Sequence, residues 1–336
     1  MTGKERIMAV MNHQKPDRMP CWGANSTPTF PQMEKAQAFW PEAHLEGEAM
    51  AKQAAQAYYL LGFDAVRVPF SQIYEAEALG CIVKSGREKS WPGIDRPGPY
   101  KLDDTLPEFP SDFLDRGHIP AVLEAIRLLK KEFGDSGPAI VGGMIGPFTI
   151  AADLVEVEKM LKATFKQPDK IPPFIDFAEK AGTMFANAMI DAGADIIVNE
   201  DMTASPDLII PKSYGALELE PQKRQFAAMK KVPKVLHICG KVDSIVEWMG
   251  QTGADCLSIE PAADVALARE KCGPDMVLMG GVDVKFTLFS KGPEDVMEES
   301  EAEIAKGLQM LAPGCSIAPG SPTENLVAMV EVAKRH

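Results

Sequence analysis

Short runs of apolar and β-branched residues, each bounded by Gly, Pro or Asp, recur along the chain and predict buried strands. The runs are nearly continuous in apolar residues and do not alternate with polar ones, which is typical of parallel strands buried on both faces. Two weaker candidates bring the number of predicted strands to eight. The clear runs are residues 64–68, 139–142, 195–199, 234–239, 256–259 and 276–279, and the weaker ones are residues 19–22 and 314–317.

Stretches with an apolar period near 3.6 residues lie between these runs and predict helices. The best defined are residues 174–191, 242–252 and 294–311. Three times a helical stretch leads through Gly-Ala-Asp or Gly-Phe-Asp into a strand, which indicates a repeating βα unit. Parallel strands joined by right-handed crossovers favour closure of the sheet. We therefore predict the α/β fold class and, within it, a (β/α)8 TIM barrel.

The repeating pattern has one long interruption. Residues 85–115 are rich in Pro, Gly and Asp and have no clear period, so we predict a long loop excursion that covers one end of the barrel. We find no low-complexity tract or linker that divides the chain. Residues 1–336 are therefore expected to form a single barrel domain.

The composition is that of a globular protein with an acidic surface. Hydrophobic residues make up 46% of the chain, and 35 Lys and Arg against 48 Asp and Glu give a net charge of −13. This balance argues against nucleic acid or an anionic membrane surface as a partner. No apolar run is long enough for a transmembrane helix, and residues 1–12 lack the hydrophobic stretch of a signal peptide. We expect a cytoplasmic protein whose six cysteines are reduced.

The sharpest chemical feature is the segment 236–240 (LHICG), at the end of the predicted fifth strand. Residues two apart in a strand point to the same face, so His237 and Cys239 project together. Barrel enzymes carry their catalytic groups at this end of the strands, where Cys315 also lies. One imidazole and two thiolates suit Zn²⁺, and Glu260 is a candidate for a fourth, displaceable ligand. We predict a catalytic metal site, with a packed pair of core side chains as the alternative.

Other positions near predicted strand ends are candidates for substrate binding. Residues 199–201 (NED) end the fourth strand, although a surface loop is an equal alternative. The glycines of segment 141–147 (VGGMIGP) allow a bulky ligand to approach the backbone, and the segment has no phosphate-loop lysine. The aromatic first loop, residues 22–40, is either a substrate lid or a packed cover. The candidate substrate-binding residues are Asn25, Arg67, Gln72, Met144, Asn199 and Asp201.

Eight segments spread over nearly the whole chain carry a family resemblance. They are residues 40–44 (WPEAH), 65–70 (AVRVPF), 77–81 (EALGC), 119–126 (IPAVLEAI), 141–147 (VGGMIGP), 204–208 (ASPDL), 236–240 (LHICG) and 311–315 (LAPGC). On these segments the chain resembles the uroporphyrinogen decarboxylase superfamily. Within it, the resemblance is strongest to the corrinoid-dependent methyltransferases typified by methylcobamide:coenzyme M methyltransferases.

The resemblance implies a (β/α)8 barrel with zinc on His237, Cys239 and Cys315. In that family the zinc activates a thiol, which attacks the methyl group of a methylated corrinoid carried by a partner protein. The first expectation is therefore a zinc enzyme that transfers a methyl group from methylcobamide to a thiol such as coenzyme M. Its cofactors are zinc and the cobalamin of a corrinoid protein.

Three alternatives remain open. Residues 199–203, which include two acidic residues, and the aromatic first loop suit a methoxylated aromatic substrate. The first alternative is therefore an O-demethylase that transfers a methyl group from such a substrate to a corrinoid protein. A scaffold that merely docks a corrinoid partner is a second alternative. Uroporphyrinogen decarboxylation is disfavoured, because residues 21–31 lack the arginine-rich motif of the decarboxylases and Gln72 stands where they place an aspartate.

Overall fold

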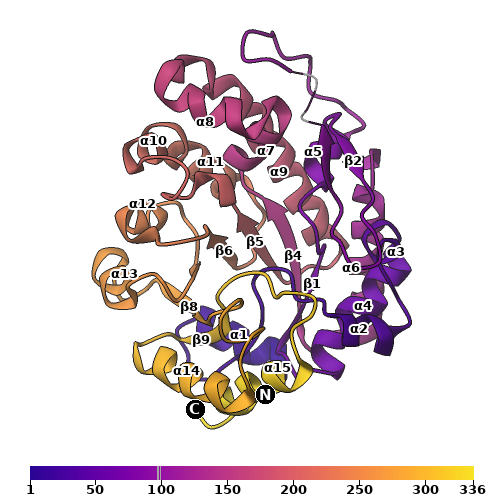
Figure 1. Cartoon of the computed structure of the whole chain (residues 1–336), viewed down its shortest axis with the longest axis vertical. Helices are drawn as coiled ribbons and strands as arrows, with labels where there is room; N and C mark the ends of the chain where they lie inside the picture. Colours follow the sequence, from indigo (N-terminus) through magenta and orange to yellow (C-terminus); the bar gives the residue numbers. More distant parts are fainter. Residues whose placement is uncertain (97, 99) are drawn as a thin grey trace.

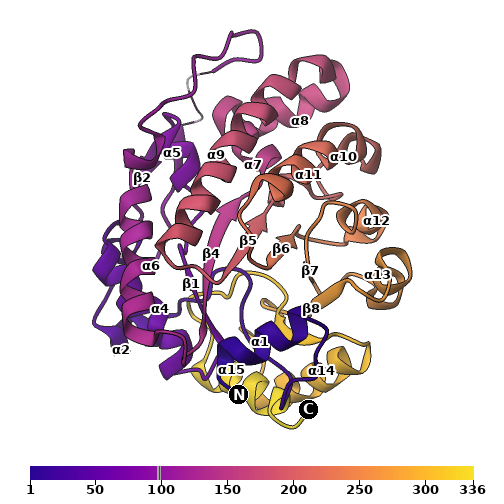
Figure 2. The ribbon, with the colours of Figure 1, turned by 180° about the vertical axis from the view of Figure 1, so that it is seen from behind.

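The computed structural model describes residues 1–96, 98 and 100–336. A sheet of seven parallel strands forms its centre, in the order β1-β4-β5-β6-β7-β8-β9 (Figure 1). The strands are β1 (Ala65–Val68), β4 (Ala139–Ile145), β5 (Ile196–Glu200), β6 (Lys234–His237), β7 (Cys256–Ile259), β8 (Val277–Val282) and β9 (Met310–Pro313). Because neighbours in the sheet follow the chain order and the sheet curls (Figure 2), the predicted TIM-barrel class is confirmed.

A short segment, residues 20–22, joins the two edges of the curled sheet. On one side, Trp22 N donates to Leu311 O on β9 at 3.2 Å, and Cys21 forms an isolated parallel bridge with Leu311. On the other side, Asp64 N, next to β1, donates to Cys21 O at 2.9 Å. This segment therefore takes the place of the first barrel strand, although its pairing is limited to a single bridge.

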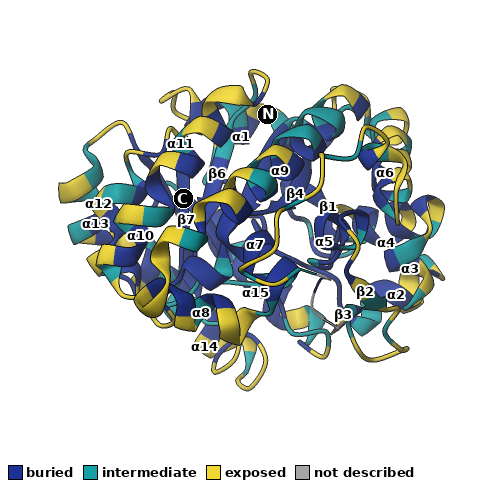
Figure 3. Ribbon diagram, turned by 90° about the horizontal axis from the view of Figure 1, so that it is seen from above, coloured by how far each residue is buried: buried dark blue, intermediate teal, exposed yellow. Residues whose placement is uncertain are grey.

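Helices surround the strands on the outside. They are α1 (Gly3–Met11), α2 (Phe30–Ala36), α3 (Glu42–Leu45), α4 (Gly47–Tyr59), α5 (Tyr74–Ala78), α6 (Ile119–Phe133), α7 (Pro147–Val155), α8 (Val157–Lys166), α9 (Pro172–Ala192), α10 (Pro211–Leu217), α11 (Leu219–Ala228), α12 (Val246–Met249), α13 (Val265–Cys272), α14 (Pro293–Ala305) and α15 (Thr323–Ala333). Their exposed residues lie on the outer faces (Figure 3). No helix in the described part of the chain is both long and apolar enough to cross a membrane.

Side chains of the strands alternate between two hydrophobic layers. One layer fills the barrel and includes Val141, Val198, Val235, Met279 and Met310. The other packs beneath the helices and includes Ile140, Ile197, Leu236, Leu257 and Leu278. Since residues two apart share a face, this alternation also decides which side chains at the strand ends reach the barrel mouth.

Two predictions near the C-terminal end of the chain are wrong. The last strand is β9, and not residues 314–317, so Cys315 lies in the loop beyond the strand. The helix predicted at residues 294–311 ends at Ala305, because the chain turns at Gly307, whose φ of +101° favours glycine, and then enters β9.

Two further segments differ from the expected pattern. The helix predicted at residues 242–252 divides into a 3₁₀ turn, η4 (Val242–Ser244), and the short helix α12. The excursion 85–115 contains β3 (Gly93–Arg96), which pairs antiparallel with β2 (Ile82–Lys84), and the 3₁₀ turn η1 (Phe113–Asp115). Positions 97 and 99 of this excursion lie outside the described residues.

Candidate metal centre and substrate cavity

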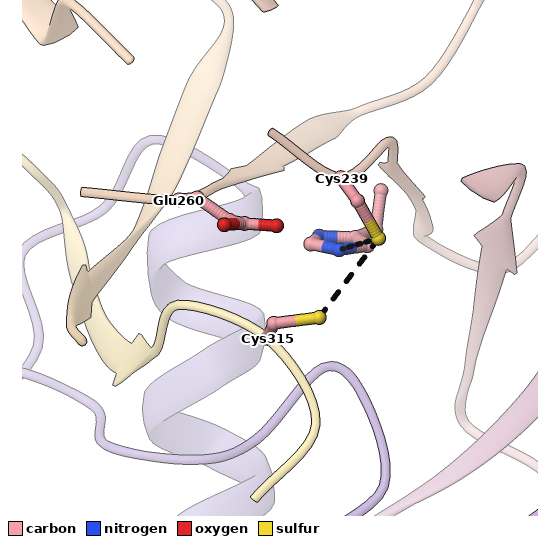
Figure 4. A group of neighbouring side chains, drawn as sticks. Cys239, Glu260 and Cys315 are labelled. Carbon is pink, nitrogen blue, oxygen red and sulfur yellow. Dashed lines mark hydrogen bonds between the residues drawn. The ribbon is translucent and has the colours of Figure 1, made fainter. Parts of the chain in front are cut away.

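Four side chains that follow or end the strands β6, β7 and β9 meet at the barrel mouth. His237, Cys239, Glu260 and Cys315 each offer one ligand atom, and these atoms all lie within 4.8 Å of one another. Cys239 Sγ lies 3.5 Å from His237 Nε2 and 3.9 Å from Cys315 Sγ. Figure 4 shows the side chains of Cys239, Glu260 and Cys315 converging on a common space. The structure thus brings together the four residues that the sequence singles out as metal ligands.

Strand geometry and one glycine produce this convergence. His237 is the last residue of β6, and Cys239 follows two positions later, so both side chains point into the barrel. The chain then bends at Gly240, whose φ of +83° is a conformation that favours glycine. This bend directs the Gly240 N–H to Glu260 Oε1 at 2.8 Å and holds the carboxylate beside the sulfurs.

The imidazole of His237 is fully buried and is held from the neighbouring strand. Its Nδ1 lies 3.1 Å from the backbone oxygen of Ser258 on β7 and 3.2 Å from the Ser258 hydroxyl. A carbonyl oxygen can only accept a hydrogen bond, so Nδ1 carries a proton and Nε2 faces the two sulfurs. Burial alone would lower the pKa of His237, but the hydrogen bond with Cys315 and its charge raise that pKa.

The two sulfurs interact directly, and their pKa values shift in opposite directions. The hydrogen bond between the two sulfurs, with a further one from His237, lowers the pKa of Cys315 despite burial. The same bond raises the pKa of Cys239. Asn25 adds a third donor to Cys315, because its Nδ2 lies 3.6 Å from the sulfur. Cys315 is therefore the more acidic of the two thiols.

The donor set fits a soft divalent cation. An imidazole nitrogen, two sulfurs and a carboxylate oxygen are the ligand types of four-coordinate Zn²⁺ sites in proteins. Burial raises the pKa of Glu260, and no Lys or Arg in the described part of the chain forms an ion pair with it. A bound cation would therefore balance the negative charge of these acidic groups, for which the described neighbouring side chains supply no Lys or Arg partner.

A buried ion pair lies next to this cluster. Arg67 on β1 pairs with Glu200 at the end of β5, and their side chains are 3% and 1% exposed. Arg67 also donates to Pro69 O at 2.6 Å, and Gly143 leaves the space that the guanidinium fills, because a Cβ there would collide with it. Gln72 Nε2 donates to Glu200 Oε2 at 2.9 Å. Two predicted site residues, Arg67 and Gln72, are thus linked through one carboxylate.

Glu200 lies in the candidate segment 199–201, but the six selected substrate-binding residues include Asn199 and Asp201 and omit Glu200, although the strand pattern contains a signal for it. It has the same parity on β5 as Ile196 and Val198, both of which lie in the layer that fills the barrel. The register pairs Glu200 with His237 on β6, so the carboxylate stands beside the metal cluster.

Three other predicted site residues point away from the mouth. Met144 belongs to the hydrophobic layer beneath the helices, and Asn199 donates to Gln225 Oε1 on α11 at 2.6 Å. Asp201 is buried and accepts hydrogen bonds from Thr149 N at 2.9 Å and Thr149 Oγ1 at 2.7 Å, which satisfies the first turn of α7. A shift of one residue turns a strand side chain to the opposite face, which explains the difference at Met144 and Asn199.

A cavity of about 490 Å³ opens beside the cluster. Its wall includes Ser316, the residue that follows Cys315, and the excursion contributes Trp91. Its lining residues include Ser and Thr residues, Gln72, the aromatic residues Phe70 and Trp91, and Asp153. The complete lining is residues 70–73, 91–94, 149, 153, 202–203 and 316–319.

Comparisons with known proteins agree with the resemblance found in the sequence. The sequence profile of the uroporphyrinogen decarboxylase (URO-D) family matches residues 2–336. The methylcobamide:CoM methyltransferase MtaA of Methanosarcina barkeri is 37% identical over 331 residues, which cover 98% of this chain and 96% of the relative. The corresponding MtbA of Methanosarcina mazei is 36% identical over 337 residues, which cover 100% and 98%. A solved methyltransferase from Methanosarcina mazei superposes with a TM-score of 0.94 at 35% identity, covering 100% of this chain and 99% of that one.

Proposed function

The chain belongs to the uroporphyrinogen decarboxylase (URO-D) family, and from this membership we propose a zinc-dependent transfer of methyl groups between a corrinoid protein and a small thiol. Two relatives that match the chain over almost its whole length are named methylcobamide:CoM methyltransferases, and coenzyme M is the thiol in their names. The observation that carries the proposal is the meeting of one imidazole nitrogen, two sulfurs and one carboxylate oxygen within 4.8 Å.

In this proposal His237, Cys239 and Cys315 hold the zinc, with Glu260 as the fourth donor. Zinc bound there supplies Lewis acidity, which lowers the pKa of a thiol and keeps its sulfur ready for attack. His237 presents Nε2 because Ser258 holds Nδ1. The Gly240 N–H holds Glu260 Oε1, and once the thiol took the fourth position the displaced Glu260 carboxylate would accept the proton that the thiol releases.

The residues around the four candidate ligands set the local charge, orient Cys315 and form part of the cavity wall. Arg67 neutralises Glu200, so the carboxylate next to His237 adds no net charge to the cluster. Asn25 directs its amide toward Cys315 and acts as a positioning residue for that sulfur. Gln72, which is held by Glu200, forms part of the cavity wall that a substrate contacts.

Metal content and methyl transfer test this proposal together. The wild-type protein and Cys315→Ser are purified without added metal and assayed for zinc and for transfer from methylcobalamin to coenzyme M. We expect about one zinc per chain in the wild type, and loss of zinc and transfer in the variant. Cys272→Ser is the matched control, because Cys272 donates to Val246 O outside the cluster. Transfer by a zinc-free wild type contradicts the metal mechanism.

A second candidate function rests on the aromatic side chains of the cavity. Phe70 and Trp91 line a space of about 490 Å³, which suits the ring of a methoxylated aromatic. The reaction is then O-demethylation, with the methyl group passing to the corrinoid. Incubation with reduced cobalamin and a methoxybenzoate distinguishes the two: formation of methylcobalamin supports demethylation, and an unchanged cobalt spectrum rejects it.

A further inference from the structure

The sulfurs of Cys239 and Cys315 contact each other at the barrel mouth. Their Sγ atoms lie 3.9 Å apart, along the dashed line between the two side chains in Figure 4. A disulfide needs sulfurs about 2 Å apart, so the side chains must approach each other before a bond can form. Of the other four cysteines, three are buried, and Cys272 donates to Val246 O outside the cluster. The pair at the mouth is therefore well placed for an intramolecular disulfide.

The backbone that carries the two sulfurs lies outside the sheet. Strand β6 ends at His237, two residues before Cys239, and β9 ends at Pro313, two residues before Cys315. Side-chain rotation and small shifts of these loop segments can therefore bring the sulfurs together without breaking hydrogen bonds between strands. The imidazole of His237, in contrast, projects from β6 and is held by Ser258. Oxidation would thus act on the two movable donors of the cluster and leave the fixed one in place.

A small oxidant has a route to the pair. Cys239 and Cys315 are both partly exposed. Ser316, the residue after Cys315, lines the cavity of about 490 Å³. A space of this size admits a low-molecular-weight disulfide. The acceptor thiol of the proposed function becomes such a disulfide when it is oxidised, so the oxidant and the substrate come from one pool of molecules.

We propose that Cys239 and Cys315 form a reversible disulfide by exchange with a low-molecular-weight disulfide, and that this bond and the metal exclude each other. One cysteine sulfur attacks the small disulfide, expels one thiol and remains bound to the other half as a mixed disulfide. The second cysteine sulfur then attacks the protein sulfur of this mixed disulfide and expels the second thiol. The two cysteines give up two electrons and two protons, and the small disulfide gains them as two thiols.

Mutual exclusion follows from the chemistry of the ligands. Cysteine binds a metal as the thiolate, and a sulfur in a disulfide no longer carries that charge. His237 and Glu260 would then be the donors left in the cluster, which are too few for a four-coordinate zinc site. Bound zinc should in turn protect the sulfurs, and an excess of reduced thiol should restore the site. The inference rests on the ligand set of the proposed function and not on the transfer of the methyl group.

Mass spectrometry of unreduced peptides tests the disulfide. The full-length chain, either loaded with zinc or stripped of it by a chelator, is incubated without oxygen with hydroxyethyl disulfide. We expect the zinc-free wild type to give peptides joined through Cys239 and Cys315 and lighter by two hydrogen atoms than the reduced pair. The zinc-loaded protein should react at least about tenfold more slowly. Mercaptoethanol should then restore both thiols and the binding of zinc, which a chromophoric chelator measures.

Variants separate a bond between the two cysteines from simple modification of each. Cys315→Ser keeps one sulfur at the cluster, so Cys239 should retain a mixed disulfide, whereas Cys272→Ser should cross-link like the wild type. The proposal is overturned by mixed disulfides on both cysteines of the wild type, by a cross-link through another cysteine or by no reaction. Equal rates in samples that differ in zinc content overturn the mutual exclusion. Cross-linking in a chain that binds no zinc leaves the disulfide intact and overturns the metal site of the proposed function.

Discussion

Ser258 sets the orientation of His237, because Nδ1 of the imidazole lies 3.1 Å from the Ser258 backbone oxygen and 3.2 Å from its hydroxyl. The two residues are register partners on the adjacent strands β6 and β7. The parallel sheet therefore holds the ring before any ligand arrives. Nε2 then faces Cys239 Sγ at 3.5 Å, which is the arrangement that a metal on both residues requires.

Loss of the Ser258 hydroxyl should weaken metal binding only moderately. Ser258→Ala keeps the carbonyl that fixes the tautomer and removes the second contact to Nδ1, so we expect zinc affinity to fall by about tenfold or less. Competition with a chromophoric chelator measures the change. The exposed Ser244 provides the control, and Ser244→Ala should bind zinc like the wild type. Equal affinity in Ser258→Ala contradicts a role for the hydroxyl.

Removal of the Asn25 amide should change the electronic state of Cys315. In Asn25→Ala the sulfur loses a donor at 3.6 Å, so the thiolate gives electrons to a metal more readily. In the Co²⁺-substituted protein we expect the sulfur-to-cobalt charge-transfer band to move to lower energy, with metal content unchanged. An identical spectrum in wild type and variant shows that Asn25 does not act on the sulfur.

Breaking the Arg67–Glu200 pair should destabilise the protein strongly. Arg67→Met leaves the Glu200 carboxylate buried without its partner, which costs about 3–5 kcal/mol of unfolding free energy. Arg67→Met combined with Glu200→Gln removes both charges and should recover much of this loss. Urea unfolding of the two single variants and the double variant measures the coupling. Additive effects in this cycle contradict a direct interaction.

The stability of Asp153→Asn relative to the wild type should depend on pH. Asp153 has a pKa of about 7 when folded, against 3.8 for an ordinary carboxyl group, because it is buried without a partner. Between these pH values the unfolded chain is ionised while the folded protein keeps the proton, so the wild type loses stability as pH rises from about 4 to about 7. Asn does not titrate. The variant should therefore gain up to ~4 kcal/mol relative to the wild type between pH 4 and pH 8.

Urea unfolding at several pH values checks this dependence, and neighbouring groups must be considered. Glu75 interacts with Asp153 and has a pKa that burial raises to about 7, so Glu75→Gln is measured alongside. Burial raises the pKa of Cys81 to about 12, so this thiol stays protonated throughout. A difference between wild type and Asp153→Asn that is constant from pH 4 to pH 8 contradicts the assigned pKa of Asp153.

Local patterns in the sequence were sufficient to predict the fold class and to place His237 and Cys239 on one face of a strand. Each buried strand is a continuous apolar run, and β7 lies at the predicted residues 256–259. The pairing of His237 with Cys239 follows from the two-residue period of a strand, which is a property of neighbouring positions. Their place at a barrel mouth follows from the repeated βα units. These features depend on a few consecutive residues, so the sequence by itself determined them.

Tertiary structure decided what depends on register and on closure of the sheet. Met144 and Asn199 face the helices while Glu200 faces the barrel, a choice that follows from how the strands align and not from residue type. Asp153 lies on helix α7, and Trp91 lies in the excursion 85–115. No sequence pattern links these two segments, yet both residues line one cavity with Ser316. Such residues become neighbours only through contacts between distant segments. These segments align when the whole core packs, so no local pattern predicts the contacts. The sequence alone indicated the four candidate ligands, and the fold decided which residues surround them.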